Sequence, residues 1–258
     1  QKNQGLSGAR NTGIKNSHGD YIIFVDSDDY IEENLLRDVM KFTLINSLDI
    51  CIYGYTRLSS DSKIISSPYL EDKIFEQDDA RASIISLNVS PMACNKLYRK
   101  DLFTLSKIYF PVNRLHEDIG TTYRLFWESN RIGQKSQSYY NWVIREESIT
   151  GSLTDKHIYD VFIHFTNTKK YLLARDEYNK YESSYIRGVF KICNILLDRI
   201  NNSSIKDRLF DTFKNCIIKN DLVTQKNVMI LKNQDEFLFN NYLNKTFRLD
   251  KRNSEQTY

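Results

Sequence analysis

Three carboxylates within four positions follow an apolar run near the start of the chain. The run extends from Tyr21 to Val25, and the acids are Asp26, Asp28 and Asp29. β-branched and aromatic residues predict a buried strand, and acids just past its carboxyl end lie where open α/β sheets bind ligands. Crowded carboxylates repel one another unless a cation lies between them, and hard oxygen ligands suit Mg²⁺ or Mn²⁺. The alternative is an acidic helix start capped by Asp29 or Asn34.

A segment reading QGLSGARNTGI precedes this strand. Residues 3–31 as a whole resemble the glycosyltransferase family 2 pattern, in which GLSxARNxGI comes before a strand that ends in DSDD. The resemblance implies a GT-A fold, a nucleotide-sugar donor, an inverting sugar transfer, and Mn²⁺ or Mg²⁺ as cofactor. By the same resemblance, Arg10 and Asn11 bind the donor. Asp26 and Asp28 form the metal-binding DxD pair, with Asp28 as the direct ligand and Asp26 closer to the ribose.

Two other motifs are excluded by the residues around them. Gly8 and Gly13 have the spacing of a phosphate-binding P-loop, but Ile14 and Lys15 follow where that loop requires Lys and then Ser or Thr. The segment HEDIG, which begins at His116, lacks the second histidine of a helical zinc-protease motif. The sequence therefore favours neither a nucleoside triphosphatase nor a zinc hydrolase.

A second acidic pair, Glu117 and Asp118, precedes a mixed apolar pattern. The pattern predicts a helix whose first turn carries both acids. An inverting transferase needs a carboxylate on the acceptor side to take the hydroxyl proton. The pair resembles the family's catalytic acids, which implies Asp118 as the base and Glu117 as a residue that contacts the acceptor or orients the site. Without that resemblance, an acidic helix start is the simpler interpretation.

Two further segments resemble the same family. Residues 139–150 read YYNWVIREESIT, which is similar to the end of the catalytic domain in bacterial polysaccharide transferases. A guanidinium at Arg145 would hold the donor diphosphate bidentately. The alternative for Arg145 is an ion pair with Glu146 or Glu147.

The other segment begins at Asn95 and reads NKLYRKDLF. Family members often carry NKLYR between the two acidic motifs. We predict that Asn95, Lys96 and Trp142 contribute to acceptor binding, with Asn95 also able to bond donor hydroxyls and Lys96 facing the anionic donor. The alternative is that the apolar residues of this segment are core and its cations are solvated.

Composition agrees with a globular enzyme. The chain has 258 residues, of which 41% are hydrophobic and 27% charged. Its four cysteines are scattered without CxxC spacing, which argues against a disulfide framework or a zinc cluster and favours buried thiols in a reducing cytosol. No apolar run reaches the roughly 18 residues of a membrane-spanning helix, and no signal peptide is recognisable. We expect a cytoplasmic protein.

The sequence predicts two domains. Residues 1–150 alternate strand-like runs with helical ones, and we expect an α/β, GT-A-like (Rossmann-like) mixed sheet core there. Residues 151–258 lack Pro, have almost no Gly, and keep apolar residues at helical spacing, which predicts an all-α extension of four or five helices. The first residue is Gln, and the family's first strands and base-binding turn have no counterpart. We therefore expect a core truncated at its N-terminus, with weak UDP binding and a tendency to oligomerise.

Charge divides at the same place. Residues 151–258 hold 18 Lys and Arg against 13 Asp and Glu, whereas residues 1–150 hold 18 against 20. The basic excess predicts peripheral contact between the helical region and the inner face of the cell membrane, where a lipid-linked acceptor would lie. It is too dispersed to predict nucleic-acid binding. A solvated helix face is the alternative interpretation.

These patterns together predict an inverting family 2 glycosyltransferase of bacterial surface polysaccharide assembly. Its partners would be a nucleotide-sugar donor, UDP-linked by expectation, and a polysaccharide or lipid-linked sugar acceptor. The alternative function is a truncated remnant that serves as an interaction module.

Overall fold

The computed structural model describes residues 3–145 and 152–255, with side chains up to residue 250. The chain forms two compact units, of which unit 1 comprises Gln1–Arg81 and Pro91–Ser152. Unit 2 comprises Ala82–Ser90 and Leu153–Tyr258. The short segment Ala82–Ser90 thus belongs with the C-terminal helices, although no sequence pattern sets it apart.

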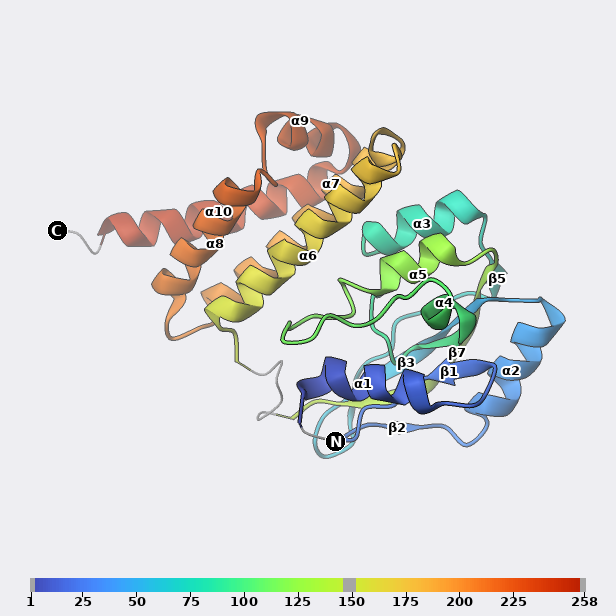
Figure 1. Ribbon diagram of the computed structural model, residues 1–258. Coiled ribbons are helices and arrows are strands. Elements are labelled where there is room, and N and C mark those ends of the chain that lie inside the picture. The colour runs from blue at the N-terminus through green and yellow to red at the C-terminus, as the bar shows by residue number, and fades with distance from the viewer. Residues whose placement is uncertain (1–2, 146–151, 256–258) are drawn as a thin grey trace. The chain divides into compact units, whose positions relative to one another are not determined.

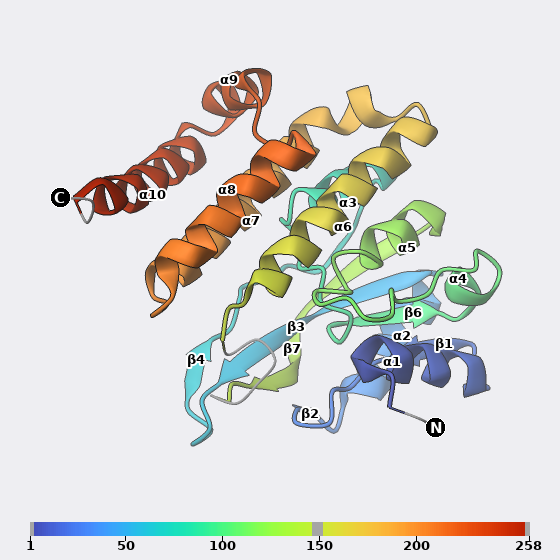
Figure 2. The same cartoon turned by 60° about the vertical axis from the view of Figure 1, so that its left-hand side comes forward.

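Unit 1 is built on a mixed sheet, which has seven strands within the described residues (Figures 1 and 2). Its main path runs β1 (Tyr21–Ile23), β6 (Lys96–Arg99), β3 (Ile50–Leu58), β7 (Ile132–Val143) and β2 (Tyr30–Ile31), with β4 (Ile64–Ser66) paired to β3 and β5 (Lys73–Ile74) paired to β7. Strands β3 and β7 are parallel, and the other pairs are antiparallel. The predicted α/β fold class is confirmed.

The helices of unit 1 are α1 (Gly5–Asn16), α2 (Leu35–Ile45), α4 (Asp101–Thr104) and α5 (Thr122–Glu128), while α3 (Gln77–Ile85) begins in unit 1 and ends in unit 2. Helix α2 packs against β3 and β7 on one face of the sheet, whereas α4 packs against β6, α1 and α5. Neighbouring strand residues point to opposite faces. In β6, Leu97 therefore joins the core under α2 and Tyr98 joins the other side.

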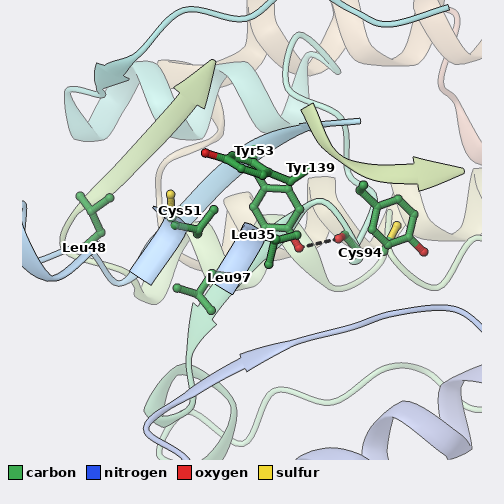
Figure 3. Packing of buried hydrophobic residues seen from close by; sticks show 9 residues of the cluster. Leu35, Leu48, Cys51, Tyr53, Cys94, Leu97 and Tyr139 are labelled. Carbon is green, nitrogen blue, oxygen red and sulfur yellow. Dashed lines mark hydrogen bonds between the residues drawn. The ribbon is translucent and has the colours of Figure 1, made fainter. Parts of the chain in front are cut away.

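The core under α2 combines aliphatic and aromatic side chains (Figure 3). Leu35 from α2 packs with Cys51 and Tyr53 from β3 and with Tyr139 from β7. The Tyr53 hydroxyl donates to the carbonyl of Cys94 at 2.8 Å, so its polar end is satisfied inside the core. Each such large side chain contributes about 1.5–3 kcal/mol by burial.

Four aromatic rings form the core on the opposite face. Phe24, which follows β1, lies 6.0 Å from Tyr98, 5.9 Å from Phe103 and 5.3 Å from Phe110 between ring centroids. The angles between Phe24 and these rings are 62–84°, the edge-to-face arrangement that aromatic pairs prefer. Through the contact of Phe24 with Phe110, the cluster packs the segment after β1 against the loop that leads to Glu117 and Asp118.

The register between β3 and β7 shifts at Gly54. Gly54 pairs with Ser138, and the next residue, Tyr55, pairs with Tyr140. A Cβ atom at Gly54 would lie 2.9 Å from the carbonyl oxygen of Gln137, so this close backbone approach requires glycine. The shift fixes which side chains at the end of β7 share a face with those of β3.

Unit 2 is helical in every described element that follows residue 152. Its helices are α6 (Asp155–Ala174), α7 (Tyr178–Asn201), α8 (Lys206–Asn220), α9 (Gln225–Gln234) and α10 (Glu236–Glu255). Helix α6 packs on α7 and α8, and α10 packs on α7 and α9. This confirms the predicted all-α C-terminal region. Nowhere in residues 3–145 and 152–255 does a helix combine the length and apolarity that crossing a bilayer requires.

Candidate active site

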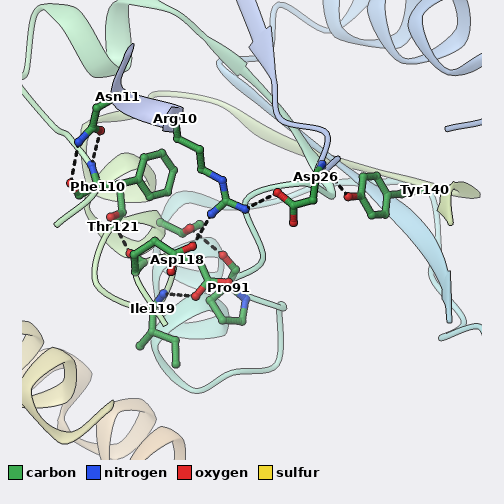
Figure 4. Close-up of polar contacts among 11 residues, drawn as sticks. Arg10, Asn11, Asp26, Pro91, Phe110, Asp118, Ile119, Thr121 and Tyr140 are labelled. Carbon is green, nitrogen blue, oxygen red and sulfur yellow. Dashed lines mark hydrogen bonds and ion pairs between the residues drawn. The ribbon is translucent and has the colours of Figure 1, made fainter. Parts of the chain in front are cut away.

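A buried arginine joins the two acidic motifs. Arg10 lies on α1, and its Nη2 donates to Asp26 Oδ1 at 2.8 Å (Figure 4). Its Nη1 donates to the carboxylate of Glu117, 107 positions away in the sequence. The guanidinium carbon also lies over the rings of Phe24 and Phe110, 5.8 and 5.3 Å from their centroids. The DxD segment and the second acidic pair, which the sequence predicts separately, therefore belong to one site.

Asn11 holds the loop that carries the second acidic pair. Its Nδ2 donates to the carbonyl of Phe110, and the Phe110 amide donates back to Asn11 Oδ1, both at 2.8 Å (Figure 4). The carboxamide is thus engaged by backbone within the protein. Its predicted contact with the donor stays a prediction, and its observed contact positions the chain before Glu117.

The second acidic pair lies in a turn rather than in a helix. We predicted that a helical first turn carries both acids, which is wrong, because α5 begins only at Thr122. His116 has a φ of 55°, a left-handed conformation that interrupts a helix. The Asp118 carbonyl then accepts the amides of Thr121 and Thr122 at 3.1 and 2.9 Å. These bonds make Asp118 part of the turn that starts α5.

Local hydrogen bonds fix the orientation of this turn. The Thr121 hydroxyl donates to the carbonyl of Glu117 at 2.7 Å. The Ile119 amide donates to Asp118 Oδ1 at 2.8 Å (Figure 4). One oxygen of the Asp118 carboxylate is therefore held by backbone. The side chain is half-buried, so it remains accessible to a ligand.

Arg10 interacts with three carboxylates at once. Burial by itself lowers the pKa of Arg10, but the charges of Asp26, Glu117 and Asp118 outweigh that effect and raise it above its ordinary value. Burial and then the charge of Asp118 raise the pKa of Glu117 from 4.5 to about 7, against the lowering effect of Arg10. A cation shared among three acids does not compensate each of them fully. Glu117 therefore changes its protonation near neutral pH, as groups at catalytic sites often do.

Asp29 anchors the DxD segment to β7. The Tyr140 hydroxyl donates to Asp29 Oδ2 at 2.6 Å, and the Val143 amide donates to Asp29 Oδ1 at 2.9 Å. The Asp26 amide in turn donates to the Tyr140 hydroxyl at 3.2 Å (Figure 4). The sequence presented Asp29 as a metal ligand or a helix cap and gave no signal for this role, because the partners come from a strand more than 100 residues later.

The Asp28 carboxylate has no hydrogen bond or ion pair within residues 3–145 and 152–250. The Asp28 backbone carbonyl accepts from Arg145 Nη2 at 3.4 Å. The structure thus brings Arg145 to the DxD segment, and its role at the diphosphate stays a prediction. Its alternative partners, Glu146 and Glu147, lie outside the described residues.

The acids of the DxD segment fit a cation site whose ligands come partly from the protein and partly from a bound substrate. They do not fit a site in which the protein supplies every ligand. The described part of the chain has no group of three or more His, Cys, Asp or Glu side chains arranged to hold a metal ion. Mg²⁺ at phosphate-transfer sites commonly takes one or two carboxylates together with substrate oxygens. Asp28 has an unengaged carboxylate, and only one oxygen of Asp26 accepts a hydrogen bond from Arg10. This donor set fits a divalent cation that a bound diphosphate would help to hold.

Asn95 and Lys96 are both buried and bonded to each other. Lys96 Nζ donates to Asn95 Oδ1 at 2.6 Å and to the carbonyl of Met92 at 2.8 Å. Asn95 Nδ2 donates to the carbonyl of Tyr53 at 3.4 Å. Burial lowers the pKa of Lys96 to about 7, while the charges of Cys94 and Asp118 act in the opposite direction. Lys96 is therefore not a solvated cation, and the acceptor role of both residues stays a prediction.

Trp142 lies near the end of β7, beside two residues that the sequence did not single out. The guanidinium carbon of Arg57 is 5.1 Å from the centroid of the Trp142 ring system. The Tyr55 ring is 6.5 Å from it. No motif marks Tyr55 or Arg57, and the signal would have been the parallel pairing of β3 with β7.

The comparison with protein families agrees with this geometry. Residues 1–105 match the family described as Glycosyl transferase family 2. The matched region contains α1 and the DxD segment, and Glu117 and Asp118 follow it. Residues 1–105 are thus similar to glycosyltransferase family 2, and the chain has a GT-A-like fold.

Relatives and solved structures are similar over different shares of the chain. "Glycosyltransferase GlyA" of Streptococcus pneumoniae is 30% identical over 165 residues, which is 60% of this chain and 23% of GlyA. "Uncharacterized glycosyltransferase EpsJ" of Bacillus subtilis is 30% identical over 155 residues, which is 58% of this chain and 45% of EpsJ. The chain thus spans less than half the length of either relative.

The crystal structure of S. aureus TarS 1–349 has a similar fold. Its TM-score is 0.64 at 19% identity, and the match covers 98% of this chain and 72% of that chain. A second structure of TarS 1–349, in complex with UDP-GlcNAc, gives a TM-score of 0.55 at 20% identity, with 96% of this chain and 72% of that chain covered. At this level of identity the similarity establishes the fold.

Proposed function

We propose that the chain provides the catalytic site of an inverting glycosyltransferase. It would transfer a sugar from a nucleotide-sugar of the UDP class to a hydroxyl of a surface polysaccharide or a lipid-linked acceptor. The observation that carries this proposal is the buried Arg10, which binds Asp26 of the DxD segment and Glu117 of the second acidic pair. The match of residues 1–105 to glycosyltransferase family 2 supports the reaction class, and the UDP-GlcNAc complex of TarS supports the donor class.

Asp118 is proposed as the general base. It would take the proton of the acceptor hydroxyl while that oxygen attacks the sugar carbon on the face opposite the leaving diphosphate. One of its oxygens accepts the Ile119 amide, which leaves the other for the proton. Glu117 is the residue that Arg10 holds, and it would orient Asp118 within the turn.

The donor side of the site would stabilise the leaving group. Arg145, which contacts the Asp28 carbonyl, would bind diphosphate oxygens with its planar guanidinium. Asp28, with Asp26, would hold Mn²⁺ or Mg²⁺, which when bound supplies charge neutralisation at the diphosphate. A lipid-linked acceptor would place the reaction at the inner face of the membrane, where the net basic charge of residues 151–258 would favour peripheral contact.

The proposal is tested with Asp28→Asn and a matched control, Asp61→Asn, whose exposed carboxylate pairs with Lys63 in a turn. Calorimetry measures Mn²⁺-dependent UDP binding by the whole chain, and radiolabelled UDP-sugars measure turnover. We expect weak but measurable UDP binding and turnover in the wild-type chain and the control, and loss of both in Asp28→Asn. A folded wild-type chain without UDP binding would instead support an interaction module.

A further inference from the structure

Four side chains at the ends of β3 and β7 share one face of the sheet. In the parallel pairing of these strands, Tyr55 is opposite Tyr140 and Arg57 is opposite Trp142. Residues two apart on a strand point to the same side, so all four side chains lie on one face. The Tyr140 hydroxyl binds Asp29 and the Asp26 amide, so this face continues directly from the DxD segment.

Aromatic and cationic groups meet at the far end of this face. The Trp142 ring system has the Arg57 guanidinium 5.1 Å from its centroid and the Tyr55 ring 6.5 Å away at an angle of 54°. All three side chains are only partly buried, so their outer surfaces are available to a ligand. Guanidinium groups stack on aromatic faces while their N–H donors stay directed outward.

The Arg57 guanidinium lacks the carboxylate partner that Arg10 and Arg99 have. Its Nε is buried without a hydrogen bond, and within the described residues it forms no ion pair. Arg10 and Arg99 also have an unbonded Nε, but each is paired with a carboxylate through its terminal nitrogens. Buried polar groups in folded proteins are normally satisfied, so an unpaired guanidinium beside a site indicates a ligand that supplies the acceptor atoms.

We propose that Tyr55, Arg57 and Trp142 form an acceptor subsite for an anionic carbohydrate. The aromatic rings would cover the apolar face of a sugar or polyol unit, and Arg57 would bind its anionic group. Two sources share this chemistry, namely the phosphodiester of a polyol phosphate and the carboxylate of a uronic acid. This inference rests on the proposed transferase function, which it extends by giving the charge class of the acceptor.

The test measures equilibrium binding of three probes by the whole chain. The probes are a glycerol phosphate oligomer, an oligosaccharide containing glucuronic acid, and a neutral maltooligosaccharide of matched length. We expect the wild-type chain to bind one anionic probe at least 10-fold more tightly than the neutral one, because a hydrogen bond to a charged group contributes about 1.5–3 kcal/mol. The probe that binds identifies the source of the anion. Equal affinity for all three probes would overturn the inference.

Variants connect that preference to the three residues. Arg57→Gln should remove the preference for the anionic probe, and Arg57→Lys should retain part of it, because lysine keeps the charge but not the planar fork. Trp142→Leu should weaken the binding of every carbohydrate probe, and Trp142→Phe should weaken that binding less. The control is Arg37→Gln, which removes an exposed guanidinium paired with its neighbour Asp38 and should change nothing. An unchanged preference in a folded Arg57→Gln chain would contradict the inference.

UDP binding by the same samples separates this inference from the proposed function. The subsite variants should bind UDP as the wild-type chain does. If UDP binds and the chain does not prefer an anionic probe, the inference of an acceptor subsite is wrong and the proposed transferase function stands. If the preference is present and UDP does not bind, the subsite stands as a carbohydrate-binding face and the transferase function is wrong.

Discussion

Arg10 and Glu117 form a buried ion pair that connects α1 with the turn before α5. Both side chains are about nine-tenths buried, with exposures of 8% and 10%. Because Arg10 also binds Asp26, a change at this residue alters the electrostatics of both acidic motifs. The following predictions begin with this pair.

Arg10→Met should destabilise the protein by about 3–5 kcal/mol, because it leaves a buried carboxylate without its cation. Arg10→Met with Glu117→Met should recover a large part of that loss, since both charges are then absent. Urea unfolding of the two single variants and the double variant measures the coupling. Additive losses would show that Arg10 and Glu117 do not interact in solution.

The stability of the protein should decrease as the pH rises, because Glu117 loses its proton. The pKa of this group is raised in the folded protein to about 7, so its favourable contribution is present below its ordinary pKa of 4.5 and is lost as the pH rises through about 7. The free energy of unfolding of the wild-type chain, relative to Glu117→Gln, should therefore decrease between pH 5 and pH 8. A constant difference across that range would place the Glu117 pKa outside it.

Asp118→Asn should lower the transfer rate by a factor of about 10² to 10⁴, which is the usual contribution of a general base. The affinity for the donor should change little. Glu117→Gln should be milder, because it removes an orienting contact rather than the base. Steady-state kinetics of both variants, with UDP affinity from calorimetry, distinguish the two acids. An inactive Glu117 variant beside an active Asp118 variant would reverse the assignment.

The sequence predicted the α/β core and the helical C-terminal region, because each depends on a local pattern. It also singled out the acids of both motifs, whose roles stay predictions. It placed Glu117 and Asp118 in a helix, since periodicity gave no sign of the left-handed His116 that delays α5. It also missed Arg57, whose significance depends on its register with Trp142 on a distant strand. Tertiary pairing of this kind leaves no periodic trace in one sequence.

The Gly188→Ala variant should be destabilised by at least about 1–3 kcal/mol, the range typical of overpacking. A Cβ atom at this position of α7 would lie 2.0 Å from the Ile85 carbonyl oxygen, and backbone yields less readily than a flexible side chain. Gly13→Ala in α1 is the control, because a Cβ there meets nothing within 4 Å. Its helical position should make it neutral or stabilising. Thermal unfolding compares the two, and equal midpoints would contradict the close approach.

Because Ala82–Ser90 belongs to unit 2, the polypeptide passes between the units at three peptide connections: after Arg81, after Ser90 and after Ser152. A single proteolytic nick at any of them leaves the two units covalently joined by the other two. Dissection at the last connection alone would also deprive the C-terminal fragment of the residues that face Gly188. An excised helical region is therefore best produced with residues 82–90 grafted back through a designed linker.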